Sequence, residues 1–134
     1  INLPKYETER SSVMDLAADI TSTINIKPGE SSIIPTGISV SIPVNYEIQI
    51  RPRSGLAAKN QISVLNTPGT IDADYRGEIK VILINLGNKT FKVEKGIRIA
   101  QMVLCPVEKA KIKEVEDLGK TNRGSGGFGS TGTK

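Results

Sequence analysis

The residues best suited to chemistry lie in polar stretches that interrupt short runs of alternating apolar residues. In the first stretch, Arg53-Ser54-Gly55 stands at the start of a predicted helical turn. An arginine, a hydroxyl and a glycine that admits a ligand to the backbone favour an anion site, because helix N-termini offer free N–H groups. A serine N-cap beside an exposed arginine explains the same residues without a ligand, so the motif alone is a weak indication.

The second polar stretch, residues 66–77, surrounds the isolated Ile71 and Tyr75 with turn-forming residues. A hairpin from which an aspartate and a tyrosine project is typical of a pocket wall. The alternative is an ordinary polar loop in which Asp72 and Asp74 accept hydrogen bonds from backbone donors.

The third polar stretch, residues 123–132, combines glycines and hydroxyls with Arg123. Its composition resembles a phosphate-binding loop, although it lacks the Walker pattern of Lys followed by Ser or Thr. The chain has three tyrosines, two phenylalanines and no tryptophan, and two of these aromatic residues, Tyr75 and Phe128, lie in its most polar stretches. Stacking on a ring-shaped ligand explains that placement.

The composition excludes several kinds of active site. The 134 residues, enough for one domain, include no histidine and a single cysteine, Cys105. Histidine-dependent triads, HExxH zinc sites, structural zinc sites and an internal disulfide are therefore impossible, and proton transfer falls to Asp, Glu, Lys or Tyr. No segment approaches the roughly 20 apolar residues of a membrane helix, and no signal peptide is recognisable, so we expect a cytoplasmic protein without membrane association.

The charge distribution does not indicate nucleic-acid binding. The formal net charge is +4, and the densest basic cluster, Lys109, Lys111 and Lys113, alternates as the solvent face of a strand does. A nucleic-acid groove needs clustered basic residues interleaved with aromatic ones, which this chain does not supply.

The elements that must position these residues are predicted to be short strands. Residues 37–42 and 46–51 alternate, with Ile38, Val40 and Ile42, and then Tyr46, Ile48 and Ile50, on the inner face. Residues 79–85 and 97–104 are apolar on both faces, as covered strands are, and Gly87-Asn88 is predicted to form a hairpin loop after the first of them. Long helical periodicity is absent, and one helical turn is expected at 54–59. The sequence therefore predicts an all-β, single-domain sandwich or distorted barrel of the jelly-roll kind.

The composition changes near Leu118. Residues 119–134 hold six of the thirteen glycines, and Phe128 is their only apolar side chain. Such a segment buries too little surface to offset its ordering entropy. We therefore expect a folded core over 1–118 and a flexible glycine-rich arm over 119–134.

Four segments in this order resemble motifs two to five of the homotrimeric dUTP pyrophosphatases (dUTPases). They are Pro52-Arg53-Ser54-Gly55-Leu56-Ala57, the stretch 69–77 (GTIDADYRG), Gly96-Ile97-Arg98-Ile99-Ala100-Gln101, and the arm from Arg123 to Gly132. Each motif alone is modest, but four in order with matching separations are highly specific. Met14-Asp15-Leu16 resembles motif one, although the family usually has glycine where Val13 stands.

The resemblance implies hydrolysis of dUTP to dUMP and pyrophosphate, which limits uracil incorporation into DNA and supplies dUMP for thymidylate synthesis. It implies a homotrimer whose sites lie between subunits, with Mg²⁺ as the cofactor and Asp15 bound to the ion through water. Asp72 would hold and deprotonate the attacking water, with Gln101 helping to position it. The residues expected to bind substrate are Arg53, Ser54 and Gly55 at the phosphates, Asn66, Thr70 and Ile71 at the uracil, Tyr75 at the deoxyribose, and Lys80 through its backbone.

The arm acquires a role from the same resemblance. Closed over a site on another subunit, Arg123 would contact the γ-phosphate and Phe128 would stack on uracil, with Gly129, Ser130 and Thr131 around the phosphates. Ordering about ten flexible residues costs roughly 1 to 2 kcal/mol each, so closure should require a triphosphate.

Two other functions fit the sequence less well. A dCTP deaminase shares this fold, but the position that resembles its general-base glutamate is Ile82, and residues 79–85 contain no carboxylate. A non-catalytic relative of the dUTPases would be expected to lack Asp72, Tyr75 or the arm, and all are present.

Overall fold

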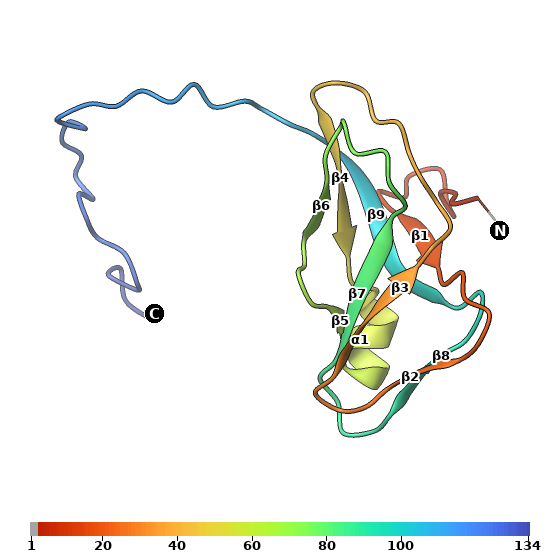
Figure 1. Ribbon diagram of the computed structural model, residues 1–134. Helices are drawn as coiled ribbons and strands as arrows, with labels where there is room; N and C mark the ends of the chain where they lie inside the picture. The colour runs from red at the N-terminus through yellow and green to blue at the C-terminus, as the bar shows by residue number, and fades with distance from the viewer. Residues whose placement is uncertain (1–2) are drawn as a thin grey trace.

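The computed structural model describes residues 3–134. Its regular elements are short β-strands and one short helix, joined by turns and loops (Figure 1). The elements are β1 (Met14–Ala17), β2 (Ile24–Ile26), β3 (Ser31–Pro35), β4 (Tyr46–Arg51), α1 (Ser54–Asn60), β5 (Ile62–Val64), β6 (Gly69–Ile71), β7 (Lys80–Asn85), β8 (Phe91–Val93) and β9 (Arg98–Pro106). The predicted all-β, jelly-roll-like fold with one short helix is confirmed.

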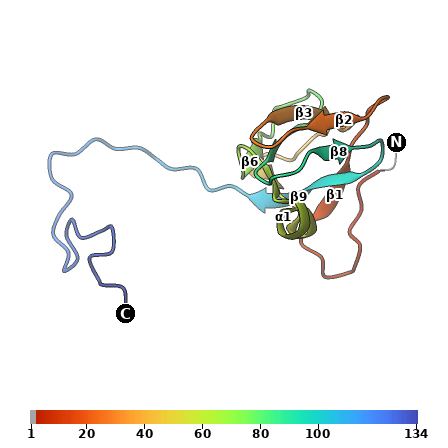
Figure 2. The ribbon, with the colours of Figure 1, turned by 90° about the horizontal axis from the view of Figure 1, so that it is seen from below.

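All strand pairs are antiparallel, and the strands form three sheets. The orders are β1-β9-β4-β6, β3-β7-β5 and β2-β8. Seen from below, β2 and β3 lie on one side of the molecule, with β1 and β9 on the other (Figure 2). The core between these layers consists of aliphatic side chains, including Ile34, Val81, Leu83, Ile50 and Met102, all at most 4% exposed.

The alternation in the sequence correctly located the long strands. The predicted segment 46–51 is β4, the segment 79–85 contains β7, and the segment 97–104 lies within β9 apart from its first residue. Ile48 and Ile50 are buried as expected, but Tyr46 is 41% exposed. Its backbone is paired with Pro106 at the last rung between β4 and β9, where the core ends.

Three local predictions were wrong because strand partners are not visible in a local pattern. Residues 37–42 form no strand, although Ile42 is buried, and Ile38 and Val40 pack against the core. A single backbone hydrogen bond joins residues 37–42 to the residue before β7: the Ile79 N–H donates to the Ile38 carbonyl at 2.8 Å. Gly87-Asn88 does not close a hairpin, because β7 pairs with β3 and β5 while β8 pairs with β2. The lysine cluster at 109–113 is exposed but belongs to no strand.

The predicted helical turn is α1, which begins at Ser54 as expected and extends to Asn60. Gln61 ends it in the left-handed conformation, with φ of 54°, and its N–H bonds the Ala57 carbonyl at 3.1 Å. The helix has no buried residue, although Leu56 packs against the core, so α1 lies at the periphery of the sheets (Figure 1).

After β9, residues 107–134 contain no helix or strand and run away from the body of the protein (Figure 1). Because no element marks residue 118, the division between core and arm at that residue stays a prediction. Among residues 3–134, no helix has the length and apolar character needed to cross a bilayer.

Candidate active site

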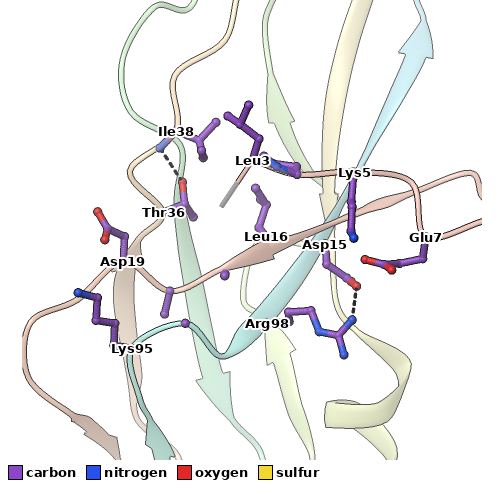
Figure 3. A pocket seen from close by; sticks show the side chains of 14 residues that line it. Leu3, Lys5, Glu7, Asp15, Leu16, Asp19, Thr36, Ile38, Lys95 and Arg98 are labelled. Atoms are coloured by element: carbon purple, nitrogen blue, oxygen red, sulfur yellow. Dashed lines mark hydrogen bonds and ion pairs between the residues drawn. The ribbon is translucent and has the colours of Figure 1, made fainter. Parts of the chain in front are cut away.

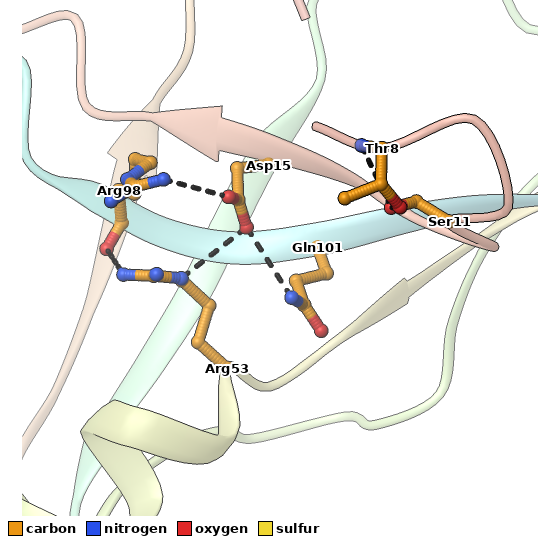
Figure 4. Close-up of polar contacts among 6 residues, drawn as sticks. All are labelled: Thr8, Ser11, Asp15, Arg53, Arg98 and Gln101. Atoms are coloured by element: carbon orange, nitrogen blue, oxygen red, sulfur yellow. Dashed lines mark hydrogen bonds and ion pairs between the residues drawn. The ribbon is translucent and has the colours of Figure 1, made fainter. Parts of the chain in front are cut away.

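A charged cluster forms where β1 and β9 meet the start of α1 (Figure 4). Asp15 on β1 is paired with Gln101 on β9. Its Oδ1 lies 3.3 Å from Arg53 Nε and accepts a hydrogen bond from Gln101 Nε2 at 3.4 Å. Its Oδ2 accepts one from Arg98 NH1 at 3.2 Å. With a side chain only 13% exposed, the carboxylate is held between two guanidinium groups.

Arg53 is fixed on two sides. Its NH1 donates to the Arg98 carbonyl at 3.3 Å, and its buried Nε faces Asp15 at ion-pair distance without hydrogen-bond geometry. Arg53, not Ser54, occupies the N-cap position of α1 and makes no side-chain cap. The interpretation of this motif as a serine N-cap beside an exposed arginine is therefore wrong.

A hollow opens beside this cluster. Its volume is about 540 Å³, and it is lined by residues of β4, α1, β9 and the loop before β6: Gln49, Arg51, Pro52, Ser54, Thr67, Pro68 and Gln101. A Cβ added to Gly55 would meet no atom within 4 Å, so the backbone there is open to a ligand. Two arginines against one carboxylate leave a net positive charge, which suits a phosphate.

Asp15 also faces a cavity on its other side. This cavity, of about 430 Å³, lies between β1 and residues 3–7, and its charged lining includes Lys5, Glu7, Asp15 and Arg98 (Figure 3). The carboxylate therefore borders open space where a hydrated ion or a water fits.

The second cluster lies in the turn between β6 and β7. Asp72, Tyr75 and Lys80 line a hollow of about 330 Å³ with Thr70, Ile71 and Glu78. The turn is closed by the Tyr75 N–H, which donates to the Asp72 carbonyl at 3.1 Å, and by Tyr75 Oη, which donates to the Glu78 carbonyl at 2.8 Å. An aspartate and an aromatic ring thus share one concave surface, as the sequence predicted for this stretch.

Asn66 lies at the entrance to β6. A Cβ on Gly69 would approach Asn66 Nδ2 to 3.3 Å, so glycine allows the amide to lie against the strand. Thr70 is exposed and Ile71 half-buried on the same short strand.

The two clusters are separated within one chain. Gln101 is paired with Arg51 at one end of β4, whereas Ile71, next to Asp72, is paired with Ile48. These two rungs are three residues apart along β4, about 10 Å, and β4 itself stands between β9 and β6. The chain therefore brings Asp15, Arg53, Ser54 and Gln101 together and brings Asp72, Tyr75 and Lys80 together, but it does not join the sets.

The arm residues are near neither cluster. Arg123 Nε donates to the Gly126 carbonyl at 2.7 Å within a local turn, and Phe128 is fully exposed. Gly129, Ser130 and Thr131 follow in exposed turns. Val13, where the resembling motif has glycine, is not among the non-glycine residues with positive φ, so valine needs no strained backbone there.

The sequence interpretation gave no role to Arg98 or Glu78. Arg98 is three residues from Gln101, which in a regular strand places the two side chains on opposite faces. Glu78 Oε2 accepts a hydrogen bond from the Gly37 N–H at 3.0 Å, which links the turn to a segment far away in the sequence. No local signal identifies either contact.

The chain is similar to known proteins along almost its whole length. The dUTPase family model matches residues 1–132. The deoxyuridine 5'-triphosphate nucleotidohydrolase of Rickettsia bellii is 63% identical over 130 residues, covering 97% of this chain and 87% of the relative. That of Crocosphaera subtropica is 62% identical over 130 residues, covering 97% and 90%.

Solved structures of phage enzymes have the same fold. The dUTPase of Staphylococcus bacteriophage 80alpha with dUPNHPP has a TM-score of 0.89 at 26% identity, covering 98% of this chain and 92% of that chain. A mutant dUTPase of phage phi11 of S. aureus, described with a structural Mg(II) ion, has a TM-score of 0.79 at 22% identity, covering 87% and 91%.

Proposed function

The chain belongs to the dUTPase family, and from that premise we propose that it hydrolyses dUTP to dUMP and pyrophosphate. Water attacks the α-phosphorus, the bond from that phosphorus to the bridging oxygen breaks, and pyrophosphate leaves. The reaction limits uracil incorporation into DNA and supplies dUMP for thymidylate synthesis. The observation that carries the proposal is that Ser54 and Gln101 line one hollow beside the ion pair of Asp15 with Arg53.

The cluster around Asp15 is proposed to bind the triphosphate. Arg53 has no protein partner for its NH2 among residues 3–134, so that group is free to donate to a phosphate oxygen. The Ser54 hydroxyl and the open backbone at Gly55 lie next to it. Gln101, held through its Nε2, keeps its side-chain oxygen available for the attacking water.

The turn between β6 and β7 is proposed to supply the binding sites for uracil and deoxyribose, and the catalytic general base. Asp72 takes the proton of the attacking water, because a carboxylate is the natural acceptor in a chain without histidine. Tyr75 packs on the deoxyribose where a 2′-hydroxyl would clash. Asn66, Thr70 and Ile71 read the uracil edge, and Lys80, at the rim of the same hollow, contributes a backbone contact.

A homotrimer explains why the cluster around Asp15 and the turn that carries Asp72 and Tyr75 lie apart on one chain. In a closed ring, the phosphate-binding cluster of one subunit can face the Asp72–Tyr75 turn of the next. The arm then closes over a site on another subunit. Its Arg123 binds the γ-phosphate, Phe128 stacks on uracil, and Gly129, Ser130 and Thr131 surround the phosphates. The exposed position of Phe128 supports this proposal, because an unburied aromatic ring is available for stacking.

Mg²⁺ is the proposed cofactor, and the residues fit a water-mediated contact only. Among residues 3–134, no three acidic or thiol side chains lie together as a metal cage, and both Asp15 oxygens already contact arginine or glutamine donors. Mg²⁺ commonly keeps several waters and binds substrate phosphates, so Asp15 would hold a water of the hydrated ion. When bound, the ion neutralises charge on the phosphates.

We also propose that the protein works in the cytoplasm, binding neither nucleic acid nor membrane stably. The nucleotide substrate and the scattered basic residues support this view.

The direct test is hydrolysis of separate dUTP, dCTP, dTTP and UTP samples with Mg²⁺, followed by separation of nucleotides and assay of pyrophosphate. We expect dUMP and pyrophosphate from dUTP alone. Release of ammonia from dCTP would establish the deaminase instead, and inertness toward all four would contradict an enzymatic role.

A complementation experiment tests the shared site. Differently tagged Asp72→Asn and Arg53→Lys chains are co-expressed, and mixed oligomers are purified through both tags. Each variant alone should be nearly inactive. Mixed trimers should regain activity at sites that take Arg53 from an Asp72→Asn chain and Asp72 from an Arg53→Lys chain. Verified mixed trimers without recovered activity would contradict the shared site.

A further inference from the structure

The placement of Arg98 beside Asp15 depends on an irregularity in β9. Asp15 is paired with Gln101 and Leu16 with Ala100, so a regular ladder would pair Ala17 with Ile99. Instead, Ala17 is paired with Arg98, and the register shifts between Leu16 and Ala17. One extra residue on β9 opposite this step is the signature of a β-bulge.

The bulge changes which face Arg98 occupies. Side chains alternate along a strand, so Arg98 and Gln101, three positions apart, would normally point to opposite faces. With the additional residue, both reach the face of Asp15, while Ile99 is 1% exposed. Bulges often re-aim a side chain next to an active site, and here the re-aimed side chain carries a full charge.

Arg98 contributes two contacts to the cluster, and together they close a ring (Figure 4). Its guanidinium NH1 donates to Asp15 Oδ2 at 3.2 Å, and its own carbonyl accepts from Arg53 NH1 at 3.3 Å. The ring is completed by Arg53 Nε, 3.3 Å from Asp15 Oδ1. Arg98 thus fixes Oδ2 of Asp15 through its guanidinium and NH1 of Arg53 through its backbone carbonyl.

We propose that Arg98 is a positioning residue: through Asp15 it fixes the orientation of Arg53 and of the carboxylate that meets the hydrated Mg²⁺. The proposal rests on the proposed function and deepens it. Arg98 itself touches neither substrate nor the reacting atoms. Its side chain is 53% exposed, so its importance comes from this geometry and not from burial.

The geometry explains why a second arginine is needed. Without Arg98, Asp15 is held only through Oδ1, by Arg53 and Gln101, and its Oδ2 can turn to a second nitrogen of Arg53 and draw it away from the phosphates. With Oδ2 occupied by Arg98, the carboxylate plane is fixed, and Arg53 can meet it only through Nε. Its NH2, which has no protein partner among residues 3–134, then remains free for the ligand. Partners that orient a ligand-binding group are typically worth about 10- to 100-fold in affinity or activity.

A double-mutant cycle tests the proposal. We expect Arg98→Gln to raise the KM for dUTP, and the Mg²⁺ concentration giving half-maximal activity, by about tenfold. We expect Asp15→Asn to lose at least as much, and the double variant to lose no more than Asp15→Asn alone. Arg98→Lys, which keeps the charge, should recover part of the loss, and Lys92→Gln, an exposed charge on β8, should behave as wild type. Wild-type behaviour of Arg98→Gln, or fully additive losses in the double variant, would overturn the proposal.

A second measurement does not need catalysis. The Arg53 Nε–H is buried, so it should give a slowly exchanging ¹⁵N side-chain signal, identified by its loss in Arg53→Lys. We expect Arg98→Gln to shift this signal and speed its exchange, while the backbone amide spectrum of the core stays unchanged. An unchanged Arg53 signal would overturn the positioning role. If the wild type failed to hydrolyse dUTP but the signal moved, the proposed function would fail while the Arg98 contact stood.

Discussion

Tyr75 Oη donates a hydrogen bond to the backbone carbonyl of Glu78 at 2.8 Å, so the ring folds back over its own turn. Gly77 lies beneath that ring, and a Cβ there would stand 2.5 Å from Tyr75 Oη and 2.6 Å from Cζ. Glu78 in turn accepts from the Gly37 N–H through its carboxylate. The position of the proposed sugar-discriminating ring is therefore set by a glycine that leaves room and a carbonyl that anchors it.

Gly77→Ala should weaken discrimination against ribose without unfolding the protein. The methyl group would push the ring off the Glu78 carbonyl, because a side chain gives way more easily than the backbone. We expect the ratio of kcat/KM for dUTP over UTP to fall by about tenfold, equivalent to about 1.4 kcal/mol. Tyr75→Phe, which keeps the ring but loses the hydrogen bond, should change the ratio less. An unchanged ratio in Gly77→Ala would mean that Tyr75 does not exclude the ribose.

Asp72→Asn should remove the proton acceptor while keeping the shape of the turn. Asp72 is exposed and, among residues 3–134, its carboxylate has no ion-pair or hydrogen-bond partner. Its loss should therefore leave the thermal midpoint unchanged and lower kcat by roughly 10²- to 10⁴-fold. Single-turnover kinetics with dUTP measure this effect. A fall in kcat smaller than tenfold would assign the general base to another group.

A chain ending at Leu118 should fold but bind the triphosphate poorly. Residues 119–134 contribute no helix, no strand and no member of the core cluster, so removing them should leave the thermal midpoint within about one degree. We expect kcat/KM for dUTP to fall by at least tenfold, since Arg123 and Phe128 are lost. Binding of dUMP, measured by calorimetry, should be nearly the same in both chains. An equal loss of dUMP affinity would show that the arm does not depend on the triphosphate.

Asn85→Leu should destabilise the fold. Asn85 is fully buried, and its Nδ2 donates to the Ile26 carbonyl at 2.9 Å and the Lys89 carbonyl at 2.7 Å. Its Oδ1 accepts from the Gly87 N–H at 2.9 Å. Leucine would leave these groups unpaired, at a cost of about 3 kcal/mol or more, lowering the thermal midpoint by roughly 10 °C. Asn88→Ala, at an exposed position in the same loop, is the control and should have little effect.

Mg²⁺ alone should not stabilise the protein. Because residues 3–134 hold no cluster of metal-ligating side chains, the ion should bind chiefly with the nucleotide phosphates. Thermal unfolding with EDTA and with Mg²⁺ should give the same midpoint. Mg²⁺ with a non-hydrolysable dUTP analogue should raise it, as any ligand of the folded state does. A clear rise with Mg²⁺ alone would reveal a protein-held metal site.

The sequence by itself determined where the longest strands and the helix lie and which chemistry is available. Alternation of apolar residues located β4, β7 and β9, because burial of one face or both leaves a local pattern. The absence of histidine left Asp, Glu, Lys and Tyr as the groups for proton transfer, and the order of the motifs pointed to the residues of both clusters. These properties depend on residue type and spacing along the chain, which the sequence contains completely.

Only the tertiary structure decided which residues meet. A strand's hydrogen-bond partner can come from anywhere in the chain, so local alternation could not show that 37–42 lacks a ladder or that β8 pairs with β2. Nor could it show the bulge that turns Arg98 toward Asp15, because alternation predicts the opposite face. The distance between the Asp15 cluster and Asp72 likewise follows from strand order and register. These contacts depend on long-range backbone pairing, and one inserted residue in a ladder is enough to exchange the two faces of a strand.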